Sequence, residues 1–285
     1  MARAKLGRER CMAEVVSLST AIQELVRDGD AVVAEGFSHL VPFAAVHEII
    51  RQGKRNLTAI RLSADIAFDQ LIGMGCVRKL IFSWAGNPGV GLLHRFRDAV
   101  ENSWPAPLEI EEHSHAGLAE ALTAGAAGLP FGVLRGYAGT DLLQHTPSVR
   151  QIACPFTGQP VAAVRALNPG VAIVHAQQAD RKGNVLLWGI TGVQKEAVYA
   201  STRAIVTVEE IRDRLEPVPG AVMLPASRVT AVVHAPQGAR PSYAHGYYTR
   251  DNEFYRSWDN VARDRDRFTT WMDKHVMETA VAQHA

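Results

Sequence analysis

Residues 28–42, D-G-D-A-V-V-A-E-G-F-S-H-L-V-P, decide the fold class of this chain. Ala31–Glu35 is apolar except at its last residue, which predicts a short buried strand. Gly36 ends this strand, and Pro42 suits the first turn of a following helix. The apolar residues of that helix recur at helical spacing: Phe43, Val46, Ile49 and Ile50. The stretch therefore predicts a strand, a tight glycine turn and a helix.

The glycine turn after this strand is the first candidate site. Open α/β sheets bind ligands beyond the carboxyl ends of their strands. Backbone N–H groups in a tight turn can meet a phosphate or an oxyanion. The same pattern also fits an ordinary strand–helix connection that binds nothing. These residues alone leave both interpretations open.

Strands and helices alternate along most of the chain, which predicts an α/β protein with an open, largely parallel sheet. Residues 128–170 are rich in Gly and Pro, and we expect an excursion over the surface that contacts a partner or substrate. We expect a single domain over 1–285, with 241–285 as a peripheral tail that ends in charged helices. Aromatic residues of the tail are expected at a partner interface, or else over the chain's own sheet. The other expected strands are Asn56–Leu62, Val77–Ser83, Leu108–Glu112, Val171–His175, Val185–Trp188, Ala204–Val208 and Val229–His234. The other expected helices are Ala21–Arg27, Ala64–Ile72, Leu92–Val100 and Ala116–Ala127. Thr20 and Gln23 are expected to form a capping box at the start of the first of these helices.

Composition excludes several classes of function. The chain has 285 residues and a formal net charge of +1, so nothing favours a nucleic acid or an anionic membrane as partner. No apolar run approaches the roughly 20 residues that cross a bilayer. No apolar segment follows the basic first ten residues, so no secretory signal is expected. Three widely spaced cysteines, Cys11, Cys76 and Cys154, predict a cytoplasmic location without a disulfide framework.

The opening stretch resembles the amino-terminal signature of family I coenzyme A transferases. Asp28-Gly29, Gly36-Phe37 and Pro42 match it, whereas Glu35 and Val41 replace two glycines, which suits the branch formed by the A subunit of glutaconate CoA-transferase. Four later runs extend the resemblance over about residues 15–275: L-P-F at 129–131, G-T-D at 139–141, H-A-Q-Q-A-D-R-K-G-N at 175–184 and G-Y-Y-T-R-D-N at 246–252. The resemblance implies an open α/β sheet with helices on both faces, related to the ribose-5-phosphate isomerase fold.

The resemblance also implies an active site shared between two chains. The turn at Gly36, Phe37 and Ser38 would present N–H groups to the oxyanion of a thioester. The family's covalent step needs a glutamate that lies in the B subunit, in a Glu-Asn-Gly or Glu-Ser-Gly context. Glu101-Asn102-Ser103 lacks the Gly and ends a helical pattern, so we expect no nucleophile in this chain. The implied partner is a CoA-transferase B subunit, and the implied substrates are an acyl-CoA thioester and a carboxylic acid, with no permanently bound cofactor.

Two further loops carry candidate substrate-binding residues. Ser83, Gly86 and Asn87 follow an expected strand and could hold a substrate carboxylate, or form a glycine turn capped by the Asn side chain. Ser114 and His115 follow the next strand, where Ser114 also suits a helix N-cap. No Cys/His set of zinc spacing is present, and no metal is expected. No glycine-rich nucleotide motif supports NAD or ATP binding.

Two other functions remain open. Gly36-Phe37-Ser38-His39-Leu40 is close to the G-x-S-x-G nucleophile elbow, with Leu40 in place of the last Gly, so a CoA-thioester or ester hydrolase with Ser38 as nucleophile is an alternative. Such an elbow normally follows several strands, whereas this one follows what looks like the first strand of the sheet. A non-catalytic homologue that kept the fold is the third possibility.

Overall fold

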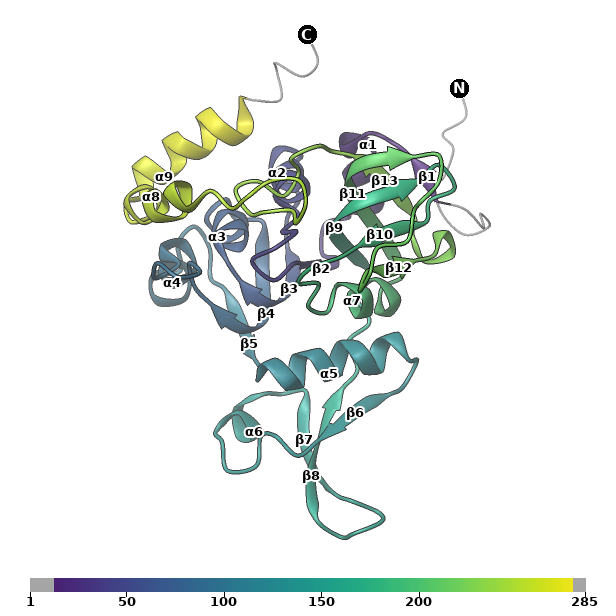
Figure 1. Cartoon of the computed structure of the whole chain (residues 1–285). Helices are drawn as coiled ribbons and strands as arrows, with labels where there is room; N and C mark the ends of the chain where they lie inside the picture. The colour runs from purple at the N-terminus through teal and green to yellow at the C-terminus, as the bar shows by residue number, and fades with distance from the viewer. Residues whose placement is uncertain (1–12, 279–285) are drawn as a thin grey trace.

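The computed structural model describes residues 13–278, and its largest feature is a ten-stranded sheet. The sheet contains β1 (Glu14–Val15), β2 (Ala31–Glu35), β3 (Leu57–Ala64), β4 (Val77–Ala85), β5 (Glu109–Glu112), β9 (Val171–Asp180), β10 (Val185–Leu187), β11 (Arg203–Arg212), β12 (Val222–Leu224) and β13 (Ala231–His234). The strand order is β1-β13-β11-β9-β2-β3-β4-β5 (Figure 1). Every pairing along this path is parallel. The β10–β9 and β10–β12 pairs, which lie off this path, are antiparallel. The predicted α/β fold class is confirmed.

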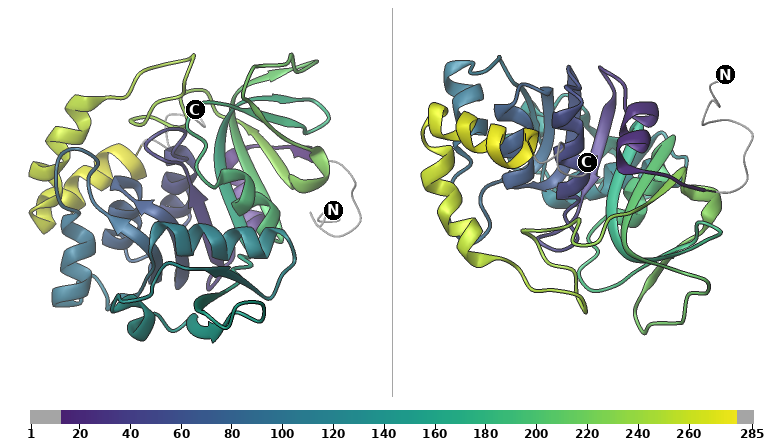
Figure 2. Two further views of the ribbon diagram at one scale, coloured as in Figure 1. Left: turned by 60° about the horizontal axis from the view of Figure 1, so that its bottom comes forward. Right: turned by 90° about the horizontal axis from the view of Figure 1, so that it is seen from above.

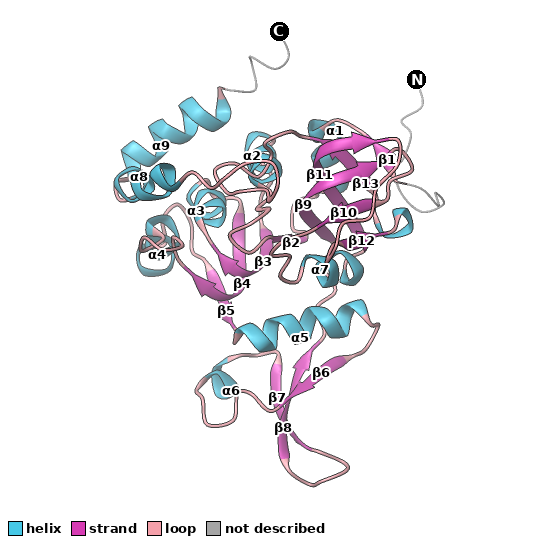
Figure 3. Cartoon of the chain, in the orientation of Figure 1, coloured by secondary structure: helices cyan, strands magenta, loops and turns pink. Residues whose placement is uncertain are grey.

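Helices cover both faces of this sheet (Figures 2 and 3). They are α1 (Leu18–Leu25), α2 (Phe43–Arg51), α3 (Ile66–Gly73), α4 (His94–Asn102), α5 (His115–Ala126), α7 (Gln194–Ala200), α8 (Asn252–Ala262) and α9 (Arg265–Met272), which a short π-helical turn, Asp273–Met277, continues. Residues of α1–α4, α8 and α9 share one buried apolar cluster, and residues of α5 and α7 belong to a second. No helix within residues 13–278 has the length and apolar character needed to cross a membrane.

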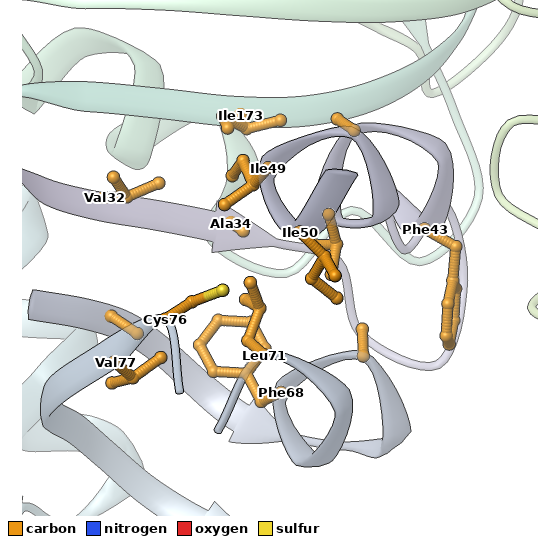
Figure 4. Packing of buried hydrophobic residues seen from close by; sticks show 14 of the residues in the cluster. Val32, Ala34, Phe43, Ile49, Ile50, Phe68, Leu71, Cys76, Val77 and Ile173 are labelled. Atoms are coloured by element: carbon orange, nitrogen blue, oxygen red, sulfur yellow. The ribbon is translucent and has the colours of Figure 1, made fainter. Parts of the chain in front are cut away.

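The central strand β2 is buried on both faces, as its continuous apolar run predicts. Val32 and Ala34 belong to one apolar cluster and Val33 to the other, because successive side chains of a strand point to opposite faces. Figure 4 shows Val32 and Ala34 beside Ile49 and Ile50 of α2. Since β2 is packed on both faces, the position of its carboxyl end, where the turn begins, is fixed.

Several element boundaries differ from the prediction by a few residues, and two of these differences have a clear local reason. Helix α1 begins earlier than expected, because the hydroxyl of Ser17 caps it by accepting from the Thr20 N–H at 3.1 Å. The predicted capping box of Thr20 and Gln23 is therefore wrong. Strand β9 continues past His175, since its polar residues Gln177 and Gln178 are also buried inside the sheet.

Residues 128–170 contain regular structure that the sequence pattern did not indicate. They form β6 (Phe131–Leu134), α6 (Leu142–His145), β7 (Val149–Ala153) and β8 (Pro160–Arg165). The three strands make a separate antiparallel sheet in the order β6-β8-β7, which lies against α5 (Figure 1). Val149, Ala162 and Val164 bury their side chains with Ala121 of α5. The expected excursion over the surface therefore contains strands that the sequence did not predict, because each strand contributes too few buried residues to produce a visible alternation.

The carboxyl-terminal segment packs into the body of the protein. Tyr255 and Trp258 are each 1% exposed, and the Trp258 indole N–H donates to the Asp69 carboxylate on α3 at 3.0 Å. These two aromatic residues belong to the chain's own core, so the expectation that they lie at a partner interface is wrong. Tyr247, by contrast, is 38% exposed.

Candidate active site

The turn between β2 and α2 lies at the carboxyl edge of the sheet, where the sequence places it. Gly36 has no room for a side chain, since a Cβ there would lie 2.6 Å from the Leu40 carbonyl oxygen and 2.9 Å from that of His39. Ser38 and Leu40 both have a φ of 53°, a left-handed conformation that is strained for residues with a Cβ. Glycine is therefore required at position 36 by close backbone approach and not by a positive φ.

Three successive N–H groups of this turn are free of protein acceptors. Those of Phe37, Ser38 and His39 donate no hydrogen bond to any residue that the structure describes. The sign of φ alternates along the turn, because it is positive at Ser38 and Leu40 only. Backbone nests bind anions through successive N–H groups of this kind in a tight turn. The turn can therefore hold a negatively charged oxygen without help from a side chain.

Two distant segments hold this turn through the imidazole of His39. The Nε2 atom accepts from the His245 N–H at 2.9 Å, and Nδ1 donates to the Ile190 carbonyl at 2.9 Å. The Nε2 atom can accept only in a neutral ring, and burial lowers the pKa of His39 accordingly. The Leu40 N–H also donates to the Tyr243 carbonyl at 2.9 Å. The turn is thus fixed to the loop after β10 and to the carboxyl-terminal segment.

A carboxyl group lies directly beneath the turn. Glu35 is 1% exposed, its Oε2 atom accepts from the Leu62 N–H at 3.2 Å, and its Oε1 atom has no hydrogen-bond partner. Burial raises the pKa of Glu35 to about 7, against the opposing charge of the nearby Arg61 guanidinium. A carboxyl group this enclosed is out of reach of a thioester carbonyl, so Glu35 does not fit the part of the nucleophile.

Side chains of three other elements surround the turn on its open side. Phe37 is 39% exposed, and its ring lies edge-on to that of His115 with 6.4 Å between the centroids. The His115 Nε2 atom is 3.1 Å from the hydroxyl of Ser63 at the end of β3. Trp84 pairs with Ser63 in the sheet and is 41% exposed. These residues form a partly aromatic, partly polar surface, which we call the edge surface (Phe37, Ser63, Trp84 and His115).

Ser114 occupies the helix N-cap position for which the sequence analysis found it suitable. It is the N-cap of α5, and its hydroxyl accepts from the Gly117 N–H at 3.0 Å. Next to it, His113 is buried between the Tyr137 hydroxyl at 2.9 Å and the Glu111 carboxylate at 3.2 Å. The structure therefore brings His115 to the edge surface, while His113 faces the small sheet.

The loop after β4 is less open than predicted. Asn87 is 1% exposed, and its side-chain amide donates to the Tyr255 carbonyl at 2.7 Å. The prediction that Asn87 binds a substrate carboxylate does not fit, because its NH₂ group is buried and already engaged. The Ser83 hydroxyl donates to the Leu62 carbonyl at 2.7 Å, which leaves its oxygen as an acceptor. Gly86 is covered by the Trp84 ring, which a Cβ at this position would meet at 2.5 Å.

Sequence reasoning missed several residues of this region. His39, Arg61 and Ser63 lie within apolar or mixed runs, and no spacing distinguishes them from ordinary core or strand residues. The sequence prediction also omitted the loop after β10. Two nearby glycines, Gly189 and Gly192, could have predicted a turn there, and both have a positive φ in the structure. A Cβ at Gly192 would lie 3.5 Å from that of Phe37.

Neither of the two candidate nucleophiles in the sequence, Glu101 and Ser38, lies in a catalytic arrangement. Helix α4 ends at Asn102 and Ser103 is its C-cap, so the interpretation of Glu101-Asn102-Ser103 as a helix end is confirmed. The Ser38 hydroxyl forms no hydrogen bond with a histidine in the described part of the chain, and the adjacent His39 ring is engaged elsewhere. Within residues 13–278, no three His, Cys, Asp or Glu side chains are grouped to hold a metal ion.

Comparison with known proteins identifies the class to which this arrangement belongs. The sequence model of the Coenzyme A transferase family matches residues 15–235. The chain is 59% identical over 268 residues to the A subunit of 3-oxoadipate CoA-transferase from Pseudomonas knackmussii, covering 94% of this chain and 95% of that protein. It is 34% identical over 287 residues to the A subunit of glutaconate CoA-transferase from Acidaminococcus fermentans, covering 94% and 89%. The crystal structure of glutaconate coenzyme A-transferase from that organism superposes with a TM-score of 0.87 at 33% identity, covering 93% and 89%.

The chain belongs to the coenzyme A transferase family. Within it, the chain is of the A-subunit type, and its recognition from the sequence as the A subunit of a family I coenzyme A transferase is confirmed.

Proposed function

We propose that this chain is the A subunit of an enzyme that moves CoA between an acyl-CoA thioester and a carboxylic acid, and that its B subunit supplies the catalytic glutamate. The observation that carries the proposal is the turn at Gly36, Phe37 and Ser38, which offers free N–H groups while the carboxyl group directly beneath it, that of Glu35, is only 1% exposed. Such a turn can stabilise an oxyanion but cannot itself attack a thioester.

The reaction assigns separate tasks to the two chains. The partner's glutamate attacks the thioester carbonyl, CoA leaves as a thiolate, and an acyl–glutamyl anhydride forms. The thiolate then attacks the glutamyl carbonyl of the anhydride, which releases the first acid and leaves a glutamyl-CoA thioester. The second acid repeats these steps in reverse. At each tetrahedral stage the negative oxygen would accept hydrogen bonds from the turn of this chain.

We propose further that the acid substrate is a dicarboxylate with a backbone like that of 3-oxoadipate. The 59% identity to the A subunit of a 3-oxoadipate CoA-transferase supports this choice over glutaconate, whose transferase is 34% identical. On the edge surface, His115 and the Ser63 hydroxyl lie 3.1 Å apart and could receive the carboxylate that does not react. Ser83, Gly86 and Ser114 would shape the surrounding pocket and not contact the reacting carbonyl.

Co-expression with the product of the neighbouring reading frame tests this function. The two chains should elute together from gel filtration, ahead of either chain alone. The complex should form 3-oxoadipyl-CoA from succinyl-CoA and 3-oxoadipate, measured by chromatography of the CoA esters, and Glu→Ala in the partner's Glu-Asn-Gly or Glu-Ser-Gly motif should abolish it. Full activity in the isolated chain would show that the shared site is wrong. Activity with other acids but not with 3-oxoadipate would refute the substrate assignment alone.

A further inference from the structure

A fully buried ion pair lies beneath the turn, in residues that the family resemblance did not single out. Arg61 on β3 is 0% exposed and Asp65, the N-cap of α3, is 1% exposed. The guanidinium binds the carboxylate through two nitrogens, at 3.0 Å from Nη1 and 2.9 Å from Nη2. Asp65 also accepts from the Ala67 N–H at 3.1 Å, which fixes the carboxylate at the start of α3.

Arg61 makes one more contact, and this contact reaches the turn. Its Nη2 atom donates to the Gly36 carbonyl oxygen at 2.6 Å. The backbone register between β2 and β3 ends at Val33 and Ile60, so the two strands separate before Gly36 is reached. Beyond that point the Arg61 side chain, together with Glu35, replaces the missing backbone hydrogen bonds. Strand β2 stays paired with β9 up to Glu35, but the Gly36–Phe37 peptide that follows the strand is held by the Arg61 side chain.

Because the peptide group is planar, the contact between Arg61 and the Gly36 carbonyl also fixes the direction of the Phe37 N–H. In a trans peptide the carbonyl of one residue and the N–H of the next point in opposite directions. Because Arg61 holds the Gly36 carbonyl toward the interior, the Phe37 N–H must point away from the guanidinium. That N–H has no acceptor among the described residues, and the Phe37 side chain is 39% exposed. The Arg61 contact is therefore what fixes the rotation of this peptide.

We propose that Arg61, held in place by Asp65, is a positioning residue that orients the Gly36–Phe37 peptide so that the Phe37 N–H faces the reacting oxyanion. The proposal rests on the transferase function proposed above. An arginine is needed because its planar fork binds both carboxylate oxygens and the carbonyl from one fixed position, which the single ammonium of lysine cannot do. Arg61 contacts no substrate and acts only through the backbone.

The test compares two matched double variants, each studied in the complex with its partner. Arg61→Met/Asp65→Asn removes both members of the ion pair together, so neither is left buried without the other, and Asn keeps the N-cap of α3. The control is Arg203→Met/Asp30→Asn, which removes another Arg–Asp pair, 3.0 Å apart, at the opposite end of β2. Each variant is first checked for thermal unfolding and for assembly with the partner.

We expect kcat of Arg61→Met/Asp65→Asn to fall by about 100-fold or more with KM changed by less than about threefold, because a donor to the transition state is lost and uniform binding is kept. The control should keep kcat within about threefold of wild type. A folded Arg61 variant with kcat equal to the control, or with its loss confined to KM, would overturn the proposal.

A second measurement does not depend on turnover. Crystal structures of the wild-type chain and of both double variants should show the Gly36–Phe37 peptide rotated or disordered only when Arg61 is replaced. An unchanged peptide in the Arg61 variant would overturn the positioning role even if activity falls. A wild-type complex that transfers no CoA would instead refute the proposed function, and the orientation of this peptide would still decide the role of Arg61.

Discussion

Replacing Glu35 by Gln should stabilise the chain at alkaline pH. Burial beneath the turn raises the pKa of Glu35 from 4.5 to about 7. An acid whose pKa is higher in the folded state stabilises the fold fully below the unfolded value, and this contribution is lost as the pH rises through the folded value. At pH 8 the wild-type chain must therefore keep a buried, ionised carboxylate with one unpaired oxygen, whereas the glutamine side chain of the variant stays neutral.

The expected size follows from the two pKa values. The difference between 4.5 and about 7, at 1.36 kcal/mol per pKa unit, corresponds to on the order of 3 kcal/mol at pH 8. At pH 5 the folded carboxyl is protonated and the unfolded one is close to its own pKa, so the advantage of Gln should shrink to under about 1 kcal/mol. The gain is thus specific to the pH range above the folded pKa.

Urea unfolding of the isolated chain at pH 5 and pH 8 measures this difference. Glu24→Gln, on the exposed side of α1, is the matched control and should behave as wild type at both pH values. The same free-energy difference between Glu35→Gln and wild type at both pH values would refute the reasoning. In the complex, Glu35→Gln should keep a substantial part of the CoA exchange; complete loss would mean that Glu35, and not a partner residue, carries the thioester.

Three further substitutions test the site. Gly36→Val should lower activity of the complex by on the order of 100-fold and also lower the unfolding temperature, since the new Cβ would meet the Leu40 carbonyl at 2.6 Å; activity within twofold of wild type would contradict the role of the turn. His115→Ala should raise KM for the dicarboxylate more than it lowers kcat, and an effect on kcat alone would remove His115 from substrate binding. Asn87→Ala should cost about 1–3 kcal/mol of stability in denaturant titration while KM stays unchanged, because the Tyr255 carbonyl loses its buried donor at 2.7 Å; a raised KM with unchanged stability would restore the original prediction for Asn87.

The sequence by itself determined the elements that local pattern controls. The apolar run Ala31–Glu35, the glycine after it and the helix from Phe43 follow from hydrophobic periodicity and turn chemistry, and the structure has the strand and the helix at these positions. Alternation of strands and helices was enough for the parallel sheet, and the parallel sheet was enough to bring the loops after β2, β4 and β5 to one edge. Several runs along the chain resemble family I coenzyme A transferases, and these runs indicated the family.

Only the tertiary structure decided which of the side chains at that edge are available. Asn87 and His115 both follow a strand, yet one is buried under Tyr255 and the other is exposed beside Phe37. The contacts that hold the turn join residues far apart in the chain, such as His39 with His245 and Gly36 with Arg61, so no local spacing encodes them. A strand pattern predicts where a strand ends. The direction in which the next peptide faces depends on hydrogen-bond partners that only folding brings together.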